Sequence, residues 1–153
     1  KRTGQKKEME SKGIVLDCGT ENTTVGFSGE DKPFSIFPTL VGQEGGEWLV
    51  GHQAAERRKE LKIKFPVEHG VVTNWEGMEK VWEHAFASEL KVDPEECPVL
   101  LSERAMTAKC NREKATEIMF ETFHVPAFSV VAHAPLVLVA EGKTEGVVVD
   151  SGA

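Results

Sequence analysis

The sequence has few cysteines, no long apolar run and fewer basic than acidic residues. Its three cysteines, Cys18, Cys97 and Cys110, show no C-x-x-C spacing, so neither a disulfide framework nor a zinc site is indicated and a reducing compartment is favoured. No segment reaches the roughly 20 apolar residues of a membrane span, and the polar N-terminus lacks a signal-peptide core. Lys and Arg total 18 against 25 Asp and Glu, a formal charge of −7, which disfavours nonspecific nucleic-acid binding. We therefore expect a soluble, intracellular protein with no direct nucleic-acid or membrane contact.

The rest of the composition is that of an ordinary globular domain. With 153 residues, 40% apolar and 28% charged, the chain is long enough to bury one core. Two basic stretches, 1–7 and 57–64, depart from the acidic balance. We interpret them as a mobile tail and a solvated helix face, and residues 1–12 as a flexible lead-in.

Short strand patterns dominate the first third of the chain. An antiparallel meander is expected, because three apolar segments are joined by glycine-bearing turns. Pro38 predicts a bulge or an edge position in the third strand. A loop at 42–47, a short strand and one or two helical turns at 54–59 follow, and 68–70 lie in a connecting loop. The predicted strands are 14–16, 23–27, 35–41 and 48–50.

Helices and strands alternate in the remainder. A helix capped by Thr73 or Asn74 carries apolar residues at helical spacing from Met78 to Leu90. A second helix is expected to begin at the cap Asn111, and a third near Pro135. Strands are predicted at 98–101, 127–132 and 147–149. This order predicts a mixed α/β domain, a meander followed by parallel crossovers.

One sequence pattern, an apolar strand followed by Asp-x-Gly, occurs near both ends of the chain. It reads GIVLDCGT at 13–20 and GVVVDSG at 146–152. Such a turn presents backbone N–H groups to a phosphate, a neighbouring hydroxyl can donate as well, and the aspartate can hold a cation through water. Taken singly, each turn is better explained as structural turn chemistry. Two such turns at the ends of two core strands favour one shared phosphate chain.

Longer stretches resemble actin along nearly the whole chain after residue 12. They are specific to actin and its relatives rather than to the wider sugar-kinase and chaperone superfamily, and they read FPVEHGVVTNW at 65–75, PEECPVLL at 94–101 and NREK…IMFETF at 111–123. The resemblance implies an α/β, ribonuclease-H-like ATPase half with a mixed five-stranded sheet and flanking helices. Subdomain 1 would comprise 13–41 and 66–153, and a shortened subdomain 2 would comprise 42–65. The second half of such a fold is missing, so we expect Ala153 to be a truncation point or the end of a partial chain.

The resemblance also implies a nucleotide site. Its expected cofactor is ATP or ADP with magnesium, the metal held through water by Asp17 and Asp150. The implied phosphate-binding residues are Asp17, Cys18, Gly19, Thr20 and Glu21 in the first turn and Asp150, Ser151 and Gly152 in the second.

Several positions depart from the actin pattern at this site. Glu21 stands where the family has a small residue, and Thr24 where it has a phosphate-binding lysine; Glu21 repels phosphate if it points inward and is neutral if it points to solvent. His133 aligns with the glutamine that positions the attacking water, the competing interpretation being a helix-start histidine bonded to backbone. Ala153 replaces an aspartate near the metal. Together these substitutions argue against efficient ATP hydrolysis and for weakened binding.

A further departure concerns assembly. Residues 43–55 are shorter than the actin loop that inserts into the next filament subunit, and only Trp48 and Leu49 could form an apolar plug. Trp48 is expected in the subdomain core, or as a contact residue if exposed. His69 aligns with the histidine of actin's phosphate-sensing loop.

Two functions follow from the resemblance. The first is a divergent actin-related protein, a cytoskeletal or complex-scaffold subunit with weak or absent ATP hydrolysis, partnered by other actin-like or cytoskeletal proteins. The second is a conventional ATP-hydrolysing actin that forms filaments. The altered turn, His133 and the short loop favour the first. The expected location is cytoplasmic and cytoskeleton-associated, with the nucleus as the alternative.

Overall fold

A mixed five-stranded sheet runs through the middle of the computed structural model, which describes residues 12–152. Its strands, in the order β3-β2-β1-β8-β9, are β1 (Ile14–Cys18), β2 (Asn22–Phe27), β3 (Ser35–Pro38), β8 (Val99–Glu103) and β9 (Phe128–Ala132). The first three pair antiparallel, and β1, β8 and β9 run parallel. The expected sheet is therefore confirmed. The predicted lead-in lies outside the described residues except for Lys12, as does Ala153.

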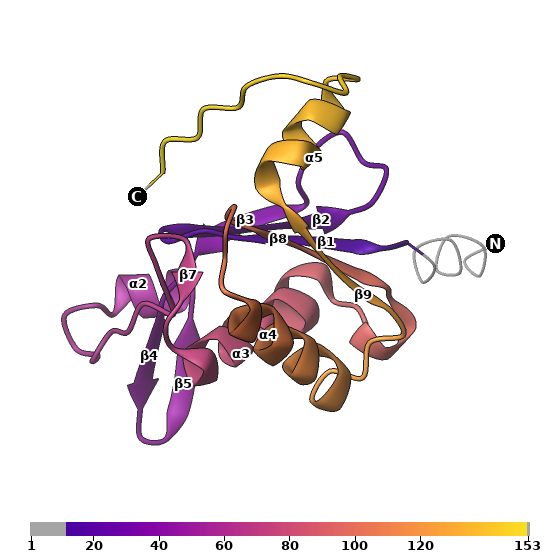
Figure 1. The fold of residues 1–153 in the computed structure, drawn as a ribbon. Helices are drawn as coiled ribbons and strands as arrows, with labels where there is room; N and C mark the ends of the chain where they lie inside the picture. The colour runs from indigo at the N-terminus through magenta and orange to yellow at the C-terminus, as the bar shows by residue number, and fades with distance from the viewer. Residues whose placement is uncertain (1–11, 153) are drawn as a thin grey trace.

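The two faces of the sheet are covered unequally (Figure 1). Helix α3 (Trp75–His84), its π-helical continuation Ala85–Leu90, and α4 (Lys109–Glu121) pack on one face. Helix α5 (His133–Ala140) lies on the other and has no buried residue. Because side chains alternate along a strand, Ile14 and Leu16 point into the helix layer and are fully buried, whereas Asp17 points to the α5 side. The hydrophobic core is therefore one-sided.

Helix starts follow the capping rules in one case and depart from them in another. The Asn74 side chain accepts a hydrogen bond from the Gly77 N–H at 2.9 Å, so Asn74 caps α3 as predicted. The predicted cap Asn111 is wrong, because the N-cap position of α4 is Ala108, three residues earlier. The Asn111 carbonyl oxygen instead faces the Cys110 thiol, at 3.7 Å, and caps no backbone N–H.

A small lobe extends from the end of β3. It contains β4 (Val41–Glu44), β5 (Glu47–Val50), α2 (His52–Glu56), β6 (Val67–Glu68) and β7 (Val71–Val72). The single strand predicted over 35–41 is wrong: Pro38 ends β3, and the Leu40 N–H turns back to the Pro38 carbonyl at 2.9 Å. The edge position predicted for Pro38 is confirmed, because β3 is the outer strand. A 3₁₀ turn, Pro94–Glu96, precedes β8.

Two predicted loops of this lobe are hairpins. Residues 42–47 hold the tight turn Gly45–Gly46 between β4 and β5, and residues 68–70 hold the turn between β6 and β7. Trp48 is half-buried and packs against the core, with the Lys64 ammonium 5.4 Å from its ring centre. The alternative of an exposed contact residue is therefore not what the structure shows for Trp48.

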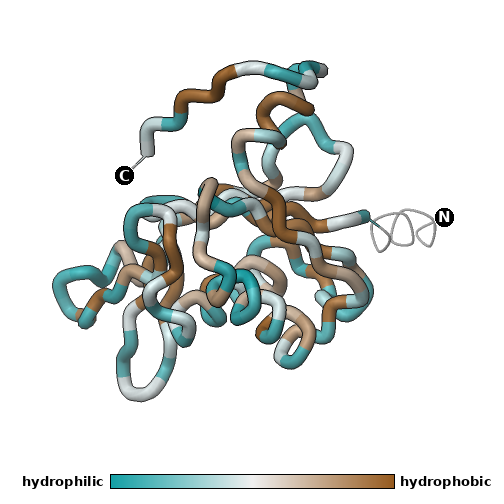
Figure 2. Tube along the Cα trace, viewed as in Figure 1, coloured by the Kyte–Doolittle hydropathy of each residue, from teal (hydrophilic) through white to brown (hydrophobic). Residues whose placement is uncertain are grey.

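The strand predicted at 147–149 is absent. This segment follows α5 as an extended tail above the sheet, an apolar stretch far from the apolar strands of the core (Figure 2). Val147 and Val149 are 91% and 88% exposed. No strand of the described residues runs beside them, so the valines have no ladder to join.

Candidate functional site

A cavity of about 580 Å³ opens at the carboxyl ends of β1 and β8. In open α/β sheets this edge is where ligands bind. The cavity is lined by the turn after β1, the β6–β7 turn, the segment after β8, the start of α5 and the C-terminal tail. The two Asp-x-Gly segments singled out from the sequence thus lie on the same cavity, although only the first is a tight turn: Asp150, Ser151 and Gly152 belong to the extended tail.

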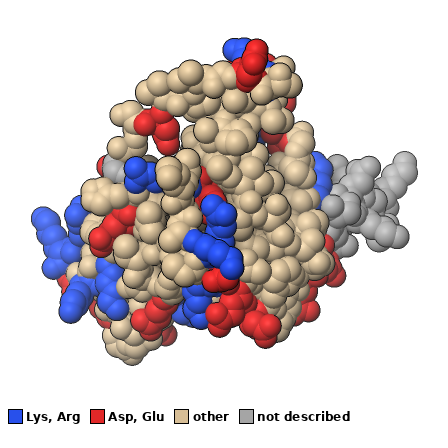
Figure 3. All heavy atoms as spheres, in the orientation of Figure 1, with Lys and Arg blue, Asp and Glu red and all other residues tan. Residues whose placement is uncertain are grey.

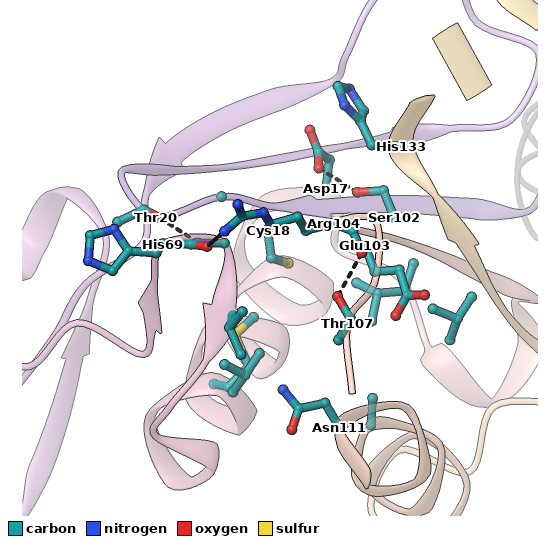
Figure 4. Close-up of a pocket in the computed structure, with 18 of the residues that line it drawn as sticks. Asp17, Cys18, Thr20, His69, Ser102, Glu103, Arg104, Thr107, Asn111 and His133 are labelled. Atoms are coloured by element: carbon teal, nitrogen blue, oxygen red, sulfur yellow. Dashed lines mark hydrogen bonds between the residues drawn. The ribbon is translucent and has the colours of Figure 1, made fainter. Parts of the chain in front are cut away.

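Asp17 provides an exposed carboxylate at the mouth. Its Oδ1 accepts a short hydrogen bond from the Ser102 hydroxyl on the neighbouring strand (Figure 4). The second carboxylate oxygen has no hydrogen-bond partner within residues 12–152. Asp17 is therefore held in place by one oxygen and can accept from water or a cation with the other.

The turn after β1 is held by a hydrogen bond within its own backbone. The Gly19 N–H donates to the Asn22 carbonyl at 2.9 Å, so it is occupied inside the turn. The Thr20 hydroxyl accepts from the Gly70 N–H at 3.0 Å, and its own proton remains able to donate to a ligand. The Glu21 side chain is exposed and does not line the cavity.

Cys18 points to the opposite side of the sheet from Asp17. There it packs among core residues beside Trp82. Burial raises the pKa of the Cys18 thiol to about 12, although the neighbouring Trp82 indole and Thr23 hydroxyl act in the other direction. The thiol is neutral at physiological pH and lines the apolar floor of the cavity.

The C-terminal tail closes the upper side. His133, the first residue of α5, places Nδ1 3.6 Å from Asp150 Oδ2. Ser151 and Gly152 follow and also line the cavity. The His133 imidazole therefore faces a carboxylate, and within residues 12–152 it forms no hydrogen bond to backbone of the kind that the helix-start interpretation required.

Thr24 lies beside this site without lining it. It pairs directly with Asp17 across β1 and β2, so both side chains project from the same face. A lysine at position 24 would therefore reach the mouth of the cavity beside Asp17. The half-buried Thr24 supplies no positive charge there.

The site residues predicted from the sequence do not include the end of β8, the loop that follows it or the first turn of α4. Ser102, Glu103, Arg104, Thr107 and Arg112 all line the cavity. The available signal was the position of Ser102, Glu103 and Arg104 at the carboxyl end of a buried strand parallel to β1, since the carboxyl ends of parallel strands meet at one edge of the sheet. His69, which the sequence did single out, lies at a positive φ of 51° in the β6–β7 turn.

The donor set suits a magnesium-bound polyphosphate. Two exposed carboxylates, Asp17 and Asp150, can hold water-coordinated Mg²⁺, and the hydroxyls of Thr20 and Ser151 can donate to phosphate oxygens. Within residues 12–152 no three His, Cys, Asp or Glu side chains converge on one point. A metal here would therefore keep most of its water.

Comparison with known families agrees with this arrangement. The family model described as Actin matches residues 8–153. In the described part of the chain, no helix is both long enough and apolar enough to cross a bilayer. The match covers the sheet, both Asp-x-Gly segments and the small lobe, and the chain belongs to the actin family.

Proposed function

We propose that this protein is a nucleotide-binding actin-related subunit that hydrolyses ATP slowly and serves as a scaffold within a cytoskeletal or other larger assembly. The observation that carries the proposal is the convergence of Asp17, Thr20 and Asp150 on one cavity with His133 at its edge. Asp17 and Asp150 would hold the water-bound magnesium, and the Thr20 and Ser151 hydroxyls the phosphates. The metal would supply charge neutralisation to the phosphate oxygens.

Slow hydrolysis is inferred from the His133–Asp150 contact. A residue that positions a nucleophilic water must present an acceptor to that water. His133 Nδ1 lies 3.6 Å from Asp150 Oδ2, which is longer than a hydrogen bond but turns this nitrogen toward a carboxylate. We infer that an imidazole oriented toward the tail is a poorer water-positioning group than a glutamine amide at the same place.

A non-polymerising role is inferred from the β4–β5 hairpin. Glu44 forms a two-pronged ion pair with Arg57, so its charge is compensated within the lobe. Of the two acidic residues that flank the Gly45–Gly46 turn, Glu47 therefore carries the uncompensated negative charge. Glu47 is exposed at the tip, opposite Glu44. Burying this carboxylate unpaired in a neighbouring subunit would be strongly unfavourable, which disfavours self-assembly through the hairpin.

Nucleotide analysis of the purified intact protein tests the proposal. We expect bound ATP or ADP after acid extraction and single-turnover hydrolysis that rises at least tenfold in His133→Gln, because the amide can hold a water (roughly 10²- to 10⁴-fold is at stake in such positioning). His133→Ala is the control and should show no gain. Absence of any nucleotide, or fast hydrolysis by the unaltered protein, would contradict the proposal.

Assembly is tested separately by sedimentation under polymerising salt. The intact protein alone should stay in the supernatant and should pellet only with an actin-like partner assembly. A sharp critical concentration for the protein alone would instead support the conventional filament-forming actin.

A further inference from the structure

Two arginines line the cavity, and their surroundings differ. Arg112 Nε lies 2.6 Å from Glu103 Oε1, and the Glu103 side chain is only 12% exposed, so this pair is neutral as a unit. Arg104 forms no ion pair with any residue of the described chain; its guanidinium contacts only a backbone carbonyl. Arg104 is therefore the cation on the cavity wall whose charge is not compensated.

Arg104 is also held in a defined position. Its Nη1 donates to the His69 carbonyl at 2.8 Å, and its stem packs over Gly70, where an added Cβ would meet Arg104 Cδ at 3.4 Å. The Arg104 carbonyl accepts from the Thr107 hydroxyl at 2.7 Å. In Figure 4 the side chain extends from the end of β8 past Cys18 toward Thr20 and His69.

Most of the hydrogen-bonding capacity of this side chain is unused. A guanidinium carries five N–H donors, and the bond to His69 occupies one of them. Its planar fork matches phosphate oxygens and can bind two at once. Arg104 thus combines a fixed stem, free N–H donors and an uncompensated positive charge. The other side-chain donors described for a phosphate in this cavity are the hydroxyls of Thr20 and Ser151.

The charge balance of the cavity requires such a cation. Asp17 and Asp150 both line it, position 24 is threonine, and the phosphates of a nucleotide add further negative charge. We propose that Arg104 binds the phosphate oxygens of the nucleotide and supplies, from the end of β8, the positive charge that position 24 does not provide. This inference rests on the nucleotide binding proposed above.

Affinity measurements on the intact protein test it, with ATP–Mg and inorganic tripolyphosphate as separate probes. Arg104→Gln should weaken both by about 10- to 100-fold, the range for losing a charge-assisted hydrogen bond. Arg104→Lys keeps the positive charge but lacks the planar guanidinium donors, so its affinity for both probes should fall by less. Lys109→Gln is the matched control, because it removes the same charge from a side chain that is 86% exposed and outside the cavity; it should change neither affinity by more than about twofold.

The outcomes separate this inference from the proposed function. If the unaltered protein binds ATP and Arg104→Gln binds it equally well, Arg104 is not a phosphate ligand, whereas nucleotide binding stands. If tripolyphosphate binds through Arg104 but ATP does not bind, the phosphate site stands and the nucleotide function falls. Binding of neither probe overturns both. Circular dichroism and melting temperature confirm that each variant is folded, and a loss shared equally by Lys109→Gln would also refute the assignment.

Discussion

Restoring a lysine at position 24 should strengthen nucleotide binding. Thr24 and Asp17 are direct partners across β1 and β2, so their Cβ atoms lie about 4.5–5.5 Å apart on one face. A lysine ammonium there would lie at the mouth of the cavity, beside Asp17 and any phosphate that Asp17 and magnesium hold. Thr24→Lys therefore adds attraction without displacing a core side chain, since Thr24 is half-buried.

The magnitude follows from Coulomb's law and the openness of the site. A unit charge pair at about 4 Å and an effective dielectric of about 20 interacts by about 4 kcal/mol. Solvent at the mouth and competition from Asp17 reduce the net gain to about 1–2 kcal/mol, which is roughly a 5- to 30-fold tighter dissociation constant. The gain should shrink as salt concentration rises.

Calorimetric titration of ATP–Mg into the intact protein measures this effect. Thr24→Met is the control for added volume without charge and should give no gain. Glu21→Gly, alone or combined, should change affinity by less than about twofold, because the Glu21 side chain is exposed and outside the cavity lining. Unchanged affinity in Thr24→Lys, in a protein that binds ATP measurably, would refute the placement of position 24 beside the phosphates.

Three further predictions concern the fold around the site. Iodoacetamide at pH 8 should modify the exposed Cys110 first and leave Cys18 unmodified, because a thiol pKa of about 12 leaves only about one molecule in 10⁴ as thiolate; mass spectrometry showing Cys18 labelled as fast as Cys110 would contradict the burial argument. The Thr23 and Thr39 hydroxyls are fully buried and 2.8 Å apart. Thr23→Val should therefore destabilise the protein by about 1–3 kcal/mol, and the double valine variant should be destabilised by less. If the decreases in melting temperature of the two single variants add up in the double variant, the two hydroxyls are not coupled. Asn74→Ala should cost about 1 kcal/mol by removing the α3 cap, and Asn74→Ser should retain most of the stability in the same thermal scan.

The sheet was predictable from the sequence, because its strands are short apolar segments bounded by turn residues. The apolar patterns at 14–16 and 98–101 indicate buried strands, and capping chemistry placed the start of α3 at Thr73 or Asn74, of which Asn74 is the cap. The strand predicted at 147–149 failed for a physical reason: three valines indicate a preference for extended backbone, but a ladder needs a neighbouring strand that local sequence does not reveal.

The candidate site was predictable where it depends on turns and not where it depends on tertiary contact. Asp17 and Asp150 were identified because each ends an apolar segment. Arg104 was missed because an arginine in a polar loop has no local signal, and its partner His69 is 35 positions away. The neutralisation of Glu44 by Arg57 was missed in the same way, since a pattern of acidic residues does not show which cation reaches them.

Basic side chains gather near α2 and the segment that follows it (Figure 3). The solvated helix face predicted for residues 57–64 is wrong, because α2 ends at Glu56 and no helix covers this segment. Part of this charge has structural partners. Arg57 binds Glu44 and Glu60, and Lys64 lies over the Trp48 ring. Arg58 lies 5.9 Å from the Phe65 ring centre. The basic segment therefore stabilises the small lobe through ion pairs and cation–aromatic contacts, and it also faces solvent.

The one-sided core sets an order of events during synthesis. Every fully buried large side chain, from Ile14 to Met119, precedes α5 in the sequence and lies in the sheet, the helix layer or the small lobe, so a nascent chain can complete that core before α5 leaves the ribosome. The apolar helix then emerges onto a surface that buries none of its residues. Since translation proceeds at about 5–20 residues per second, we expect a stage of seconds in which α5 and the valine tail are open to chaperones. Ribosome-stalled chains ending well beyond residue 128 should resist protease through α4 while α5 is cleaved, and uniform protection of both would contradict this order.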